Sequence, residues 1–206
     1  QGLPLAMFAA LLSWLAIMAV SGKQAAAERD SSAGRLRIAT LIALGIGLHN
    51  LGEGLAVGAA FALGEAALGS FLVIGFTLHN VTEGIGIAAP LVASMRQAGR
   101  ANGQETLAAP VTRDRPSLKT FIGLALLAGL PAVVGAWVGG FAYSPVLAVL
   151  FLGVGAGAIW QVIVEVGRLL IRDAEKNGEP AANWINVAGL ALGIALMYFT
   201  AYFVKF

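Results

Sequence analysis

The sequence predicts an all-α protein, a polytopic bundle of transmembrane helices, and three observations support this fold class. The chain has 206 residues, of which 58% are hydrophobic and only 12% are charged. Soluble domains carry about 25% charged residues, so this composition indicates lipid as the solvent. The apolar residues fall in six long stretches. The alternating strand pattern of a membrane β-barrel is absent from them.

Each apolar stretch reaches or approaches the roughly 20 residues that a helix needs to cross about 30 Å of hydrocarbon. We therefore expect one transmembrane domain over residues 1–206, with spans at about 3–20, 38–64, 66–95, 118–142, 145–167 and 184–204. The second and third spans are separated by almost nothing, and so are the fourth and fifth. Each of these pairs should form a tight antiparallel hairpin. Because the first residue is Gln1 rather than Met, we expect the chain to be truncated at its N-terminus.

Basic residues lie almost entirely on one side of the predicted bundle. Of the 13 Lys and Arg residues, only Lys205 falls outside the first, third and fifth connections and their flanks. The positive-inside rule makes that side cytoplasmic and places both termini outside. We therefore expect a multi-pass protein of the plasma (inner) membrane. The same bias explains the excess of basic residues, so no nucleic-acid partner is expected.

Small residues recur four positions apart in three of the predicted spans: Gly54 and Gly58, Gly135 and Gly139, Gly189 and Gly193. This spacing lets the backbones of membrane helices approach closely. We interpret it as tight packing within the chain, although a homodimer could use the same surfaces.

One polar motif occurs twice, in the middle of the second and third spans. His-Asn-Leu-Gly-Glu-Gly occupies 49–54 and His-Asn-Val-Thr-Glu-Gly occupies 79–84, and together they contain the only two histidines of the chain. Polar and ionisable residues inside a membrane are costly, so they usually serve a function. The sequence has no cysteine, which excludes disulfides and thiolate metal sites.

The spacing of the motif residues predicts a single centre. His and Glu four positions apart share one face of a helix. Counted from Glu65 at the turn, the six polar side chains lie 12 to 18 residues deep, a spread of about 9 Å. Imidazole, carboxylate and amide donors suit Zn²⁺, Fe²⁺, Mn²⁺, Co²⁺ or Cd²⁺. The predicted metal ligands are His49, Asn50, Glu53, His79, Asn80 and Glu83.

Gln161 and Glu165 form a further pair four residues apart, in the fifth span and nearer its cytoplasmic end. One interpretation is a relay or exit ligand for the metal. The alternative is that Glu165 pairs with Arg168 near the membrane interface.

The two His-Asn-x-x-Glu-Gly motifs on consecutive spans resemble the ZIP (Zrt-/Irt-like) family of divalent metal transporters. Its members have eight transmembrane helices with both termini outside, and the fourth and fifth carry the metal site. The resemblance implies that the spans here correspond to helices three to eight and that the six motif residues are ligands. Bacterial relatives can hold two metal ions there, bridged by the glutamates. Glu165 falls where the seventh helix of the family often has an acidic residue.

The chain departs from the family pattern at two places, and the first puts in doubt the opening of backbone carbonyls that a proline would cause. Gly52 and Thr82 stand where the family commonly has Pro before the motif Glu. Leu130-Pro131 stands where the sixth helix often has Glu-Pro, which weakens the case for a second metal ion.

Together these observations favour a carrier that moves divalent metal ions, Zn²⁺ first, into the cytoplasm, with the ion as its transported substrate and the lipid bilayer around it. An intramembrane metal-dependent hydrolase with the same ligands is the alternative. We do not expect an enzyme, because the sequence has no His-Glu-x-x-His motif and no separate general base. A purely structural membrane protein with polar contacts between helices is the third interpretation.

Overall fold

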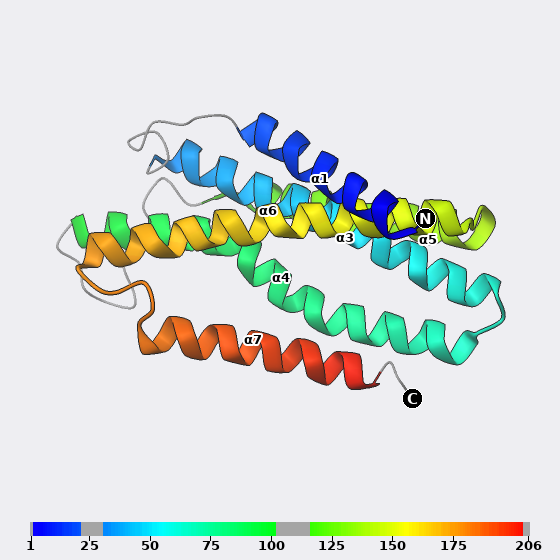
Figure 1. Ribbon diagram of the computed structural model, residues 1–206. Coiled ribbons are helices and arrows are strands. Elements are labelled where there is room, and N and C mark those ends of the chain that lie inside the picture. The colour runs from blue at the N-terminus through cyan, green and yellow to red at the C-terminus, as the bar shows by residue number, and fades with distance from the viewer. Residues whose placement is uncertain (1, 22–30, 102–115, 204–206) are drawn as a thin grey trace.

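The computed structural model of the protein describes residues 2–21, 31–101 and 116–203 (Figure 1). Within these ranges the fold is all-helical, which confirms the predicted fold class, and six helices are long and apolar enough to cross a membrane. They are α1 (Gly2–Ser21), α3 (Ser32–Ala62), α4 (Ala66–Ala101), α5 (Leu118–Phe141), α6 (Pro145–Asn177) and α7 (Trp184–Phe203).

Three helices extend beyond the apolar stretches that predicted them. Ser31 caps α3 by accepting a hydrogen bond from the backbone N–H of Gly34 at 3.0 Å, so this helix begins inside the expected 21–37 loop. The helix α4 runs on to Ala101 and α6 to Asn177. Hydropathy marks only the apolar part of a helix, whereas the backbone hydrogen bonds continue into polar sequence. Residues 22–30 and 102–115, from the two expected loops, lie outside the described residues.

Successive helices run in opposite directions, so the bundle has two distinct ends (Figure 1). The turn at 63–65 and the turn at 142–144 lie at one end, which we call the turn end. The N-terminus of α3 and the C-terminus of α6, which carry arginines, lie at the other end, which we call the basic end.

The helix α3 is the centre of the bundle and packs against α4, α5 and α6, while α1 packs on α6 and α7 on α4. The predicted hairpin of α3 and α4 is present. The predicted hairpin of α5 and α6 is wrong, because in the described part of the chain these helices have almost no contact with each other. Each uses α3 as its partner instead, and the short turn between them lets them diverge.

Glycines set the close approach of α3 and α5. A Cβ atom on Gly54 would collide with the carbonyl oxygen of Ala132, and one on Gly135 would collide with that of Leu51. These contacts confirm the expected packing within the chain for the glycines of α3 and α5. The glycines of α7 do not make such close contacts, because a Cβ atom at Gly189 would meet nothing within 4 Å.

Candidate metal centre

Glu53 joins the two histidines of the repeated motif. Its Oε1 atom lies 2.7 Å from Nε2 of His79 and 3.2 Å from Nε2 of His49. His49 and Glu53 share a face of α3 because they are one helical turn apart, and His79 reaches them from α4. Glu53 is 9% exposed and His79 is 5% exposed, so this contact is shielded from solvent.

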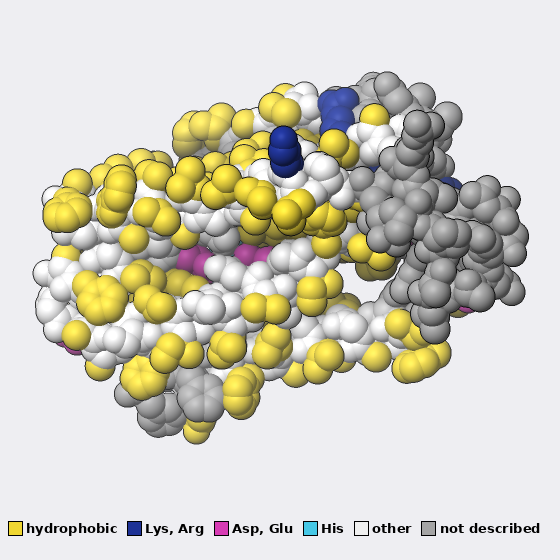
Figure 2. Space-filling model, turned by 180° about the vertical axis from the view of Figure 1, so that it is seen from behind, with side chains coloured by type: hydrophobic (Ala, Val, Ile, Leu, Met, Phe, Trp, Pro, Cys, Tyr) yellow, Lys and Arg dark blue, Asp and Glu magenta, His cyan; other side chains and the backbone are white. Residues whose placement is uncertain are grey.

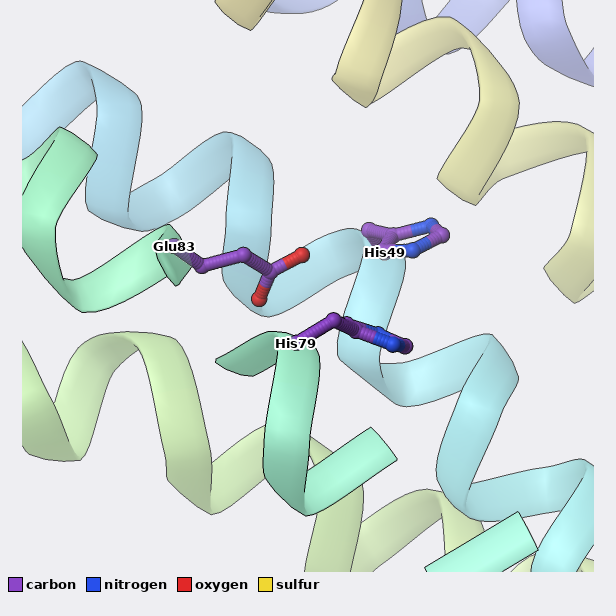
Figure 3. Close-up of side chains that lie close together, drawn as sticks. All are labelled: His49, His79 and Glu83. Atoms are coloured by element: carbon purple, nitrogen blue, oxygen red, sulfur yellow. The ribbon is translucent and has the colours of Figure 1, made fainter. Parts of the chain in front are cut away.

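Glu83 completes a group that can hold a metal ion. One ligand atom from each of His49, His79 and Glu83 lies within 4.8 Å of the other two. Figure 3 shows His49 on α3 facing His79 and Glu83 across the space between α3 and α4. Glu53, which contacts both imidazoles, lies beside this group of two imidazoles and one carboxylate. This donor set is typical of zinc and other first-row metal ions.

Two neighbours that spacing alone did not single out shape the surroundings of the histidines. The ring of Phe76 meets the His79 ring edge to face, with centroids 5.5 Å apart. Gly155 of α6 leaves room for His49, because a Cβ atom there would lie 3.4 Å from its Nδ1 atom. A Phe three residues before a motif histidine, hence on its helical face, is a signal that could have identified the first contact.

Asn50 contacts a third helix in addition to the metal centre. Its Nδ2 atom donates a hydrogen bond to the backbone carbonyl of Ala128 on α5, at 3.1 Å. The spacing of the motifs places Asn50 and Asn80 near the same groove as the histidines. The side chain of Asn50 lies beside Glu83, and its amide group also reaches α5.

Three buried oxygen atoms of the predicted ligands have no hydrogen-bond partner among the described residues: Oδ1 of Asn50, Oδ1 of Asn80 and Oε2 of Glu83. Buried polar atoms are rarely left in this state, because desolvation without a hydrogen bond is costly. All three are acceptors, as is usual for oxygen ligands of a cation. Oxygen atoms in this state are chemically suited to ligate a cation.

A cavity of about 380 Å³ lies between α3, α4 and α6 and reaches the site. His49 and Glu53 form its polar part, and Phe76, Phe151 and Ile159 are among its apolar walls. Figure 2 shows acidic side chains recessed between apolar ones near the middle of one face. His49 is 31% exposed, so an ion in the cavity can meet its imidazole.

Gln161 and Glu165 do not join this group. Nε2 of Gln161 donates to Oε1 of Glu165 at 3.1 Å, and Nη1 of Arg168 lies 3.4 Å from the same oxygen. The alternative pairing of Glu165 with Arg168 is therefore present. Both Gln161 and Glu165 are buried. Their role on the path of an ion stays a prediction.

The fold and the site define a membrane-type helical protein with a His/Glu group able to hold a metal ion. No family model, curated protein or solved structure matches the chain. The function of the protein is therefore inferred from the chemistry of the site.

Proposed function

We propose that the protein is a carrier for divalent transition-metal ions, with Zn²⁺ as the first candidate, and that it moves them into the cytoplasm. The observation that carries this proposal is the group of His49, His79 and Glu83, whose ligand atoms lie within 4.8 Å of one another on two membrane-type helices. The resemblance of the two motifs to the ZIP family supports the same function. The positive-inside rule supports the direction.

The donor set suits an ion that must be released. Structural zinc sites are closed and often rich in Cys, whereas this chain has no Cys and offers oxygen and imidazole donors. Glu53 and Glu83 together balance the charge of one divalent ion. The two carboxylates belong to α3 and α4 respectively, so a small relative movement of these helices would separate the ligands and weaken binding. Such movement of one helix block against another is how carriers alternate access.

The location of the group also favours transport over structural contact. Glu53 is 12 and His79 is 14 residues from Glu65 at the turn, so both lie about 18–21 Å from it, well inside helices long enough to cross a membrane. A site at this depth can be served from either side, and the cavity beside His49 supplies one route. Carrier sites commonly lie near the midplane of the bilayer.

Zinc influx into proteoliposomes tests the proposal. We expect influx with the native protein and background influx with the double variant Glu53→Ala, Glu83→Ala. Glu65→Ala is the matched control, because Glu65 lies exposed at the turn and outside the group. Undiminished influx in the double variant would overturn the site assignment. Hydrolysis of a lipid or peptide without influx would favour the hydrolase.

A further inference from the structure

A cluster of buried apolar side chains adjoins the metal centre. The cluster is continuous and lies between the centre and the basic end, and it includes Ile42 and Ile46 of α3, Ile87 and Leu91 of α4 and Leu124 of α5. We call these five residues the apolar plug. The cavity that reaches His49 and Glu53 lies beside the centre, between α3, α4 and α6. Apolar packing therefore separates the centre from the basic end of the bundle.

Arg35 lies beyond the plug, on the same face of α3 as the metal centre. It precedes Glu53 by 18 residues, which is about five whole turns of an α-helix, so both side chains point in the same direction. Ile46 and Ile42 lie between them on this face. The structure thus arranges along one face of α3 a metal ligand, two apolar layers and a cationic side chain.

Arg35 is unusual for an arginine, because it is only 2% exposed. Its Nη1 atom donates to the backbone carbonyl of Pro90 on α4, at 3.5 Å and across 55 residues of sequence. Pro90 is also fully buried, and it follows Glu83 by seven residues, about two turns along the same face of α4. Arg35 therefore connects the two helices that carry the metal ligands, at the basic end of the plug.

We infer that Arg35 and the apolar plug form the gate of the carrier on the basic side, closed in this structure. This inference rests on the proposed function, because a gate has a role only in a protein that carries an ion. Apolar side chains close the path, because they give a hydrated cation no oxygen ligands, and Arg35 holds α3 and α4 together beside them. Opening requires α3 and α4 to separate at the basic end, which breaks the contact between Arg35 and Pro90. The same separation pulls the ligands of the two helices apart, so opening and release occur together.

Cysteine labelling tests the gate, and the absence of native cysteine makes the readout specific. Ile42 is 0% exposed and lies between Arg35 and the centre, so Ile42→Cys reports access through the gate. The labelling rate with a polar thiol reagent is compared in detergent for three forms, all with Ile42→Cys: the native background, Arg35→Ala and Arg37→Ala. Arg37 is the matched control, because it lies on the same turn but is exposed and donates to carbonyls at the end of α1.

We expect slow labelling in the native and Arg37→Ala backgrounds, and a rate about tenfold higher or more with Arg35→Ala, as for a buried position exposed by local opening. If Arg35→Ala does not fold, Arg35→Gln replaces it in the labelling test, because Gln keeps a hydrogen-bond donor but has no charge. Equally slow labelling in all forms would overturn the role of Arg35. Fast labelling in the native background would overturn the closed gate, whatever the arginine variants do.

Zinc binding separates this inference from the proposed function. Arg35 is 14 residues from His49, about 21 Å along α3, so we expect Arg35→Ala to keep zinc affinity within about twofold. If the native protein bound no zinc, the proposed function would fail while the labelling contrast still tested the gate. If Arg35→Ala abolished zinc binding without raising the labelling rate, Arg35 would belong to the site and not to a gate.

Discussion

Nε2 of His79 lies 2.7 Å from Oε1 of Glu53, although the two residues belong to different helices and are 26 positions apart. The same carboxylate oxygen lies 3.2 Å from Nε2 of His49. Glu53 thus holds the two imidazoles of the chain together, and Glu83 adds a second carboxylate beside them.

Glu53→Gln should weaken zinc binding most among single carboxylate changes. Gln keeps the size of the side chain but removes the charge, and Glu53 is the carboxylate in contact with both imidazoles. Loss of even an outer-shell partner of a metal site costs about 10–100-fold in affinity, so we expect about 100-fold or more here. Calorimetric zinc titration measures it, with Glu65→Gln as the control. Affinity equal to that of the control would contradict a ligand role for Glu53.

Asn80→Leu should affect stability and zinc affinity in opposite directions. Oδ1 of Asn80 is buried without a partner among the described residues, so its removal should leave the metal-free protein unchanged or stabilise it by up to about 1–3 kcal/mol. If this oxygen contributes to metal binding, zinc affinity falls by about tenfold in the same variant. Thermal unfolding without metal and a zinc titration give the two values.

Asn50→Leu is the comparison for that variant, because Asn50 has a hydrogen bond to lose. Its amide donates to Ala128 across the interface of α3 and α5, and such bonds in membranes contribute on average about 0.6 kcal/mol. We expect lower stability here. Zinc affinity that rose in either variant would argue against the asparagine oxygens as ligands.

Part of this site could be predicted from the sequence because helices have a fixed rise. The turn at Glu65 aligns α3 with α4, so counting residues placed Glu53 and His79 at nearly equal depth, and the structure brings them into contact. Counting residues cannot show which other helix packs against each side chain. The contact of Asn50 with α5 was therefore not predicted.

Helix pairing followed surface shape and not connection length. A short turn predicted a hairpin of α5 and α6, but α5 instead lies against α3, where glycines on both helices remove the side chains that would keep the backbones apart. The glycine spacing was visible in the sequence. The pairing of one glycine face with another required the three-dimensional structure.

Gly54→Ala should destabilise the bundle. The added methyl group would collide with the Ala132 carbonyl, a backbone atom that cannot move alone, so we expect a cost of about 1–3 kcal/mol. Gly189→Ala is the matched control, because the same substitution in α7 meets nothing within 4 Å. There the better helix propensity of Ala should be neutral or stabilising by up to about 1 kcal/mol. Thermal unfolding in detergent compares the two, and equal midpoints would contradict close packing of α3 and α5.

Glu165→Gln should keep zinc affinity within about twofold, because Glu165 is held by Gln161 and Arg168 of its own helix and lies outside the His/Glu group. A change in influx rate at unchanged affinity would instead support the relay role. Influx and equilibrium binding are measured on the same preparation, with Arg168→Gln as the control for the ion pair. A large loss of affinity would place Glu165 in the metal centre.

Anomalous diffraction at the zinc absorption edge, from crystals grown with Zn²⁺, tests the central claim most directly. We predict a peak between α3 and α4, at zinc–nitrogen distances of about 2.0–2.1 Å from the imidazoles of His49 and His79. Glu53 and Glu83 should supply oxygen ligands to the same ion. Absence of a peak at this position, or zinc bound only at the ends of the helices, would contradict the proposal that this centre binds the transported metal.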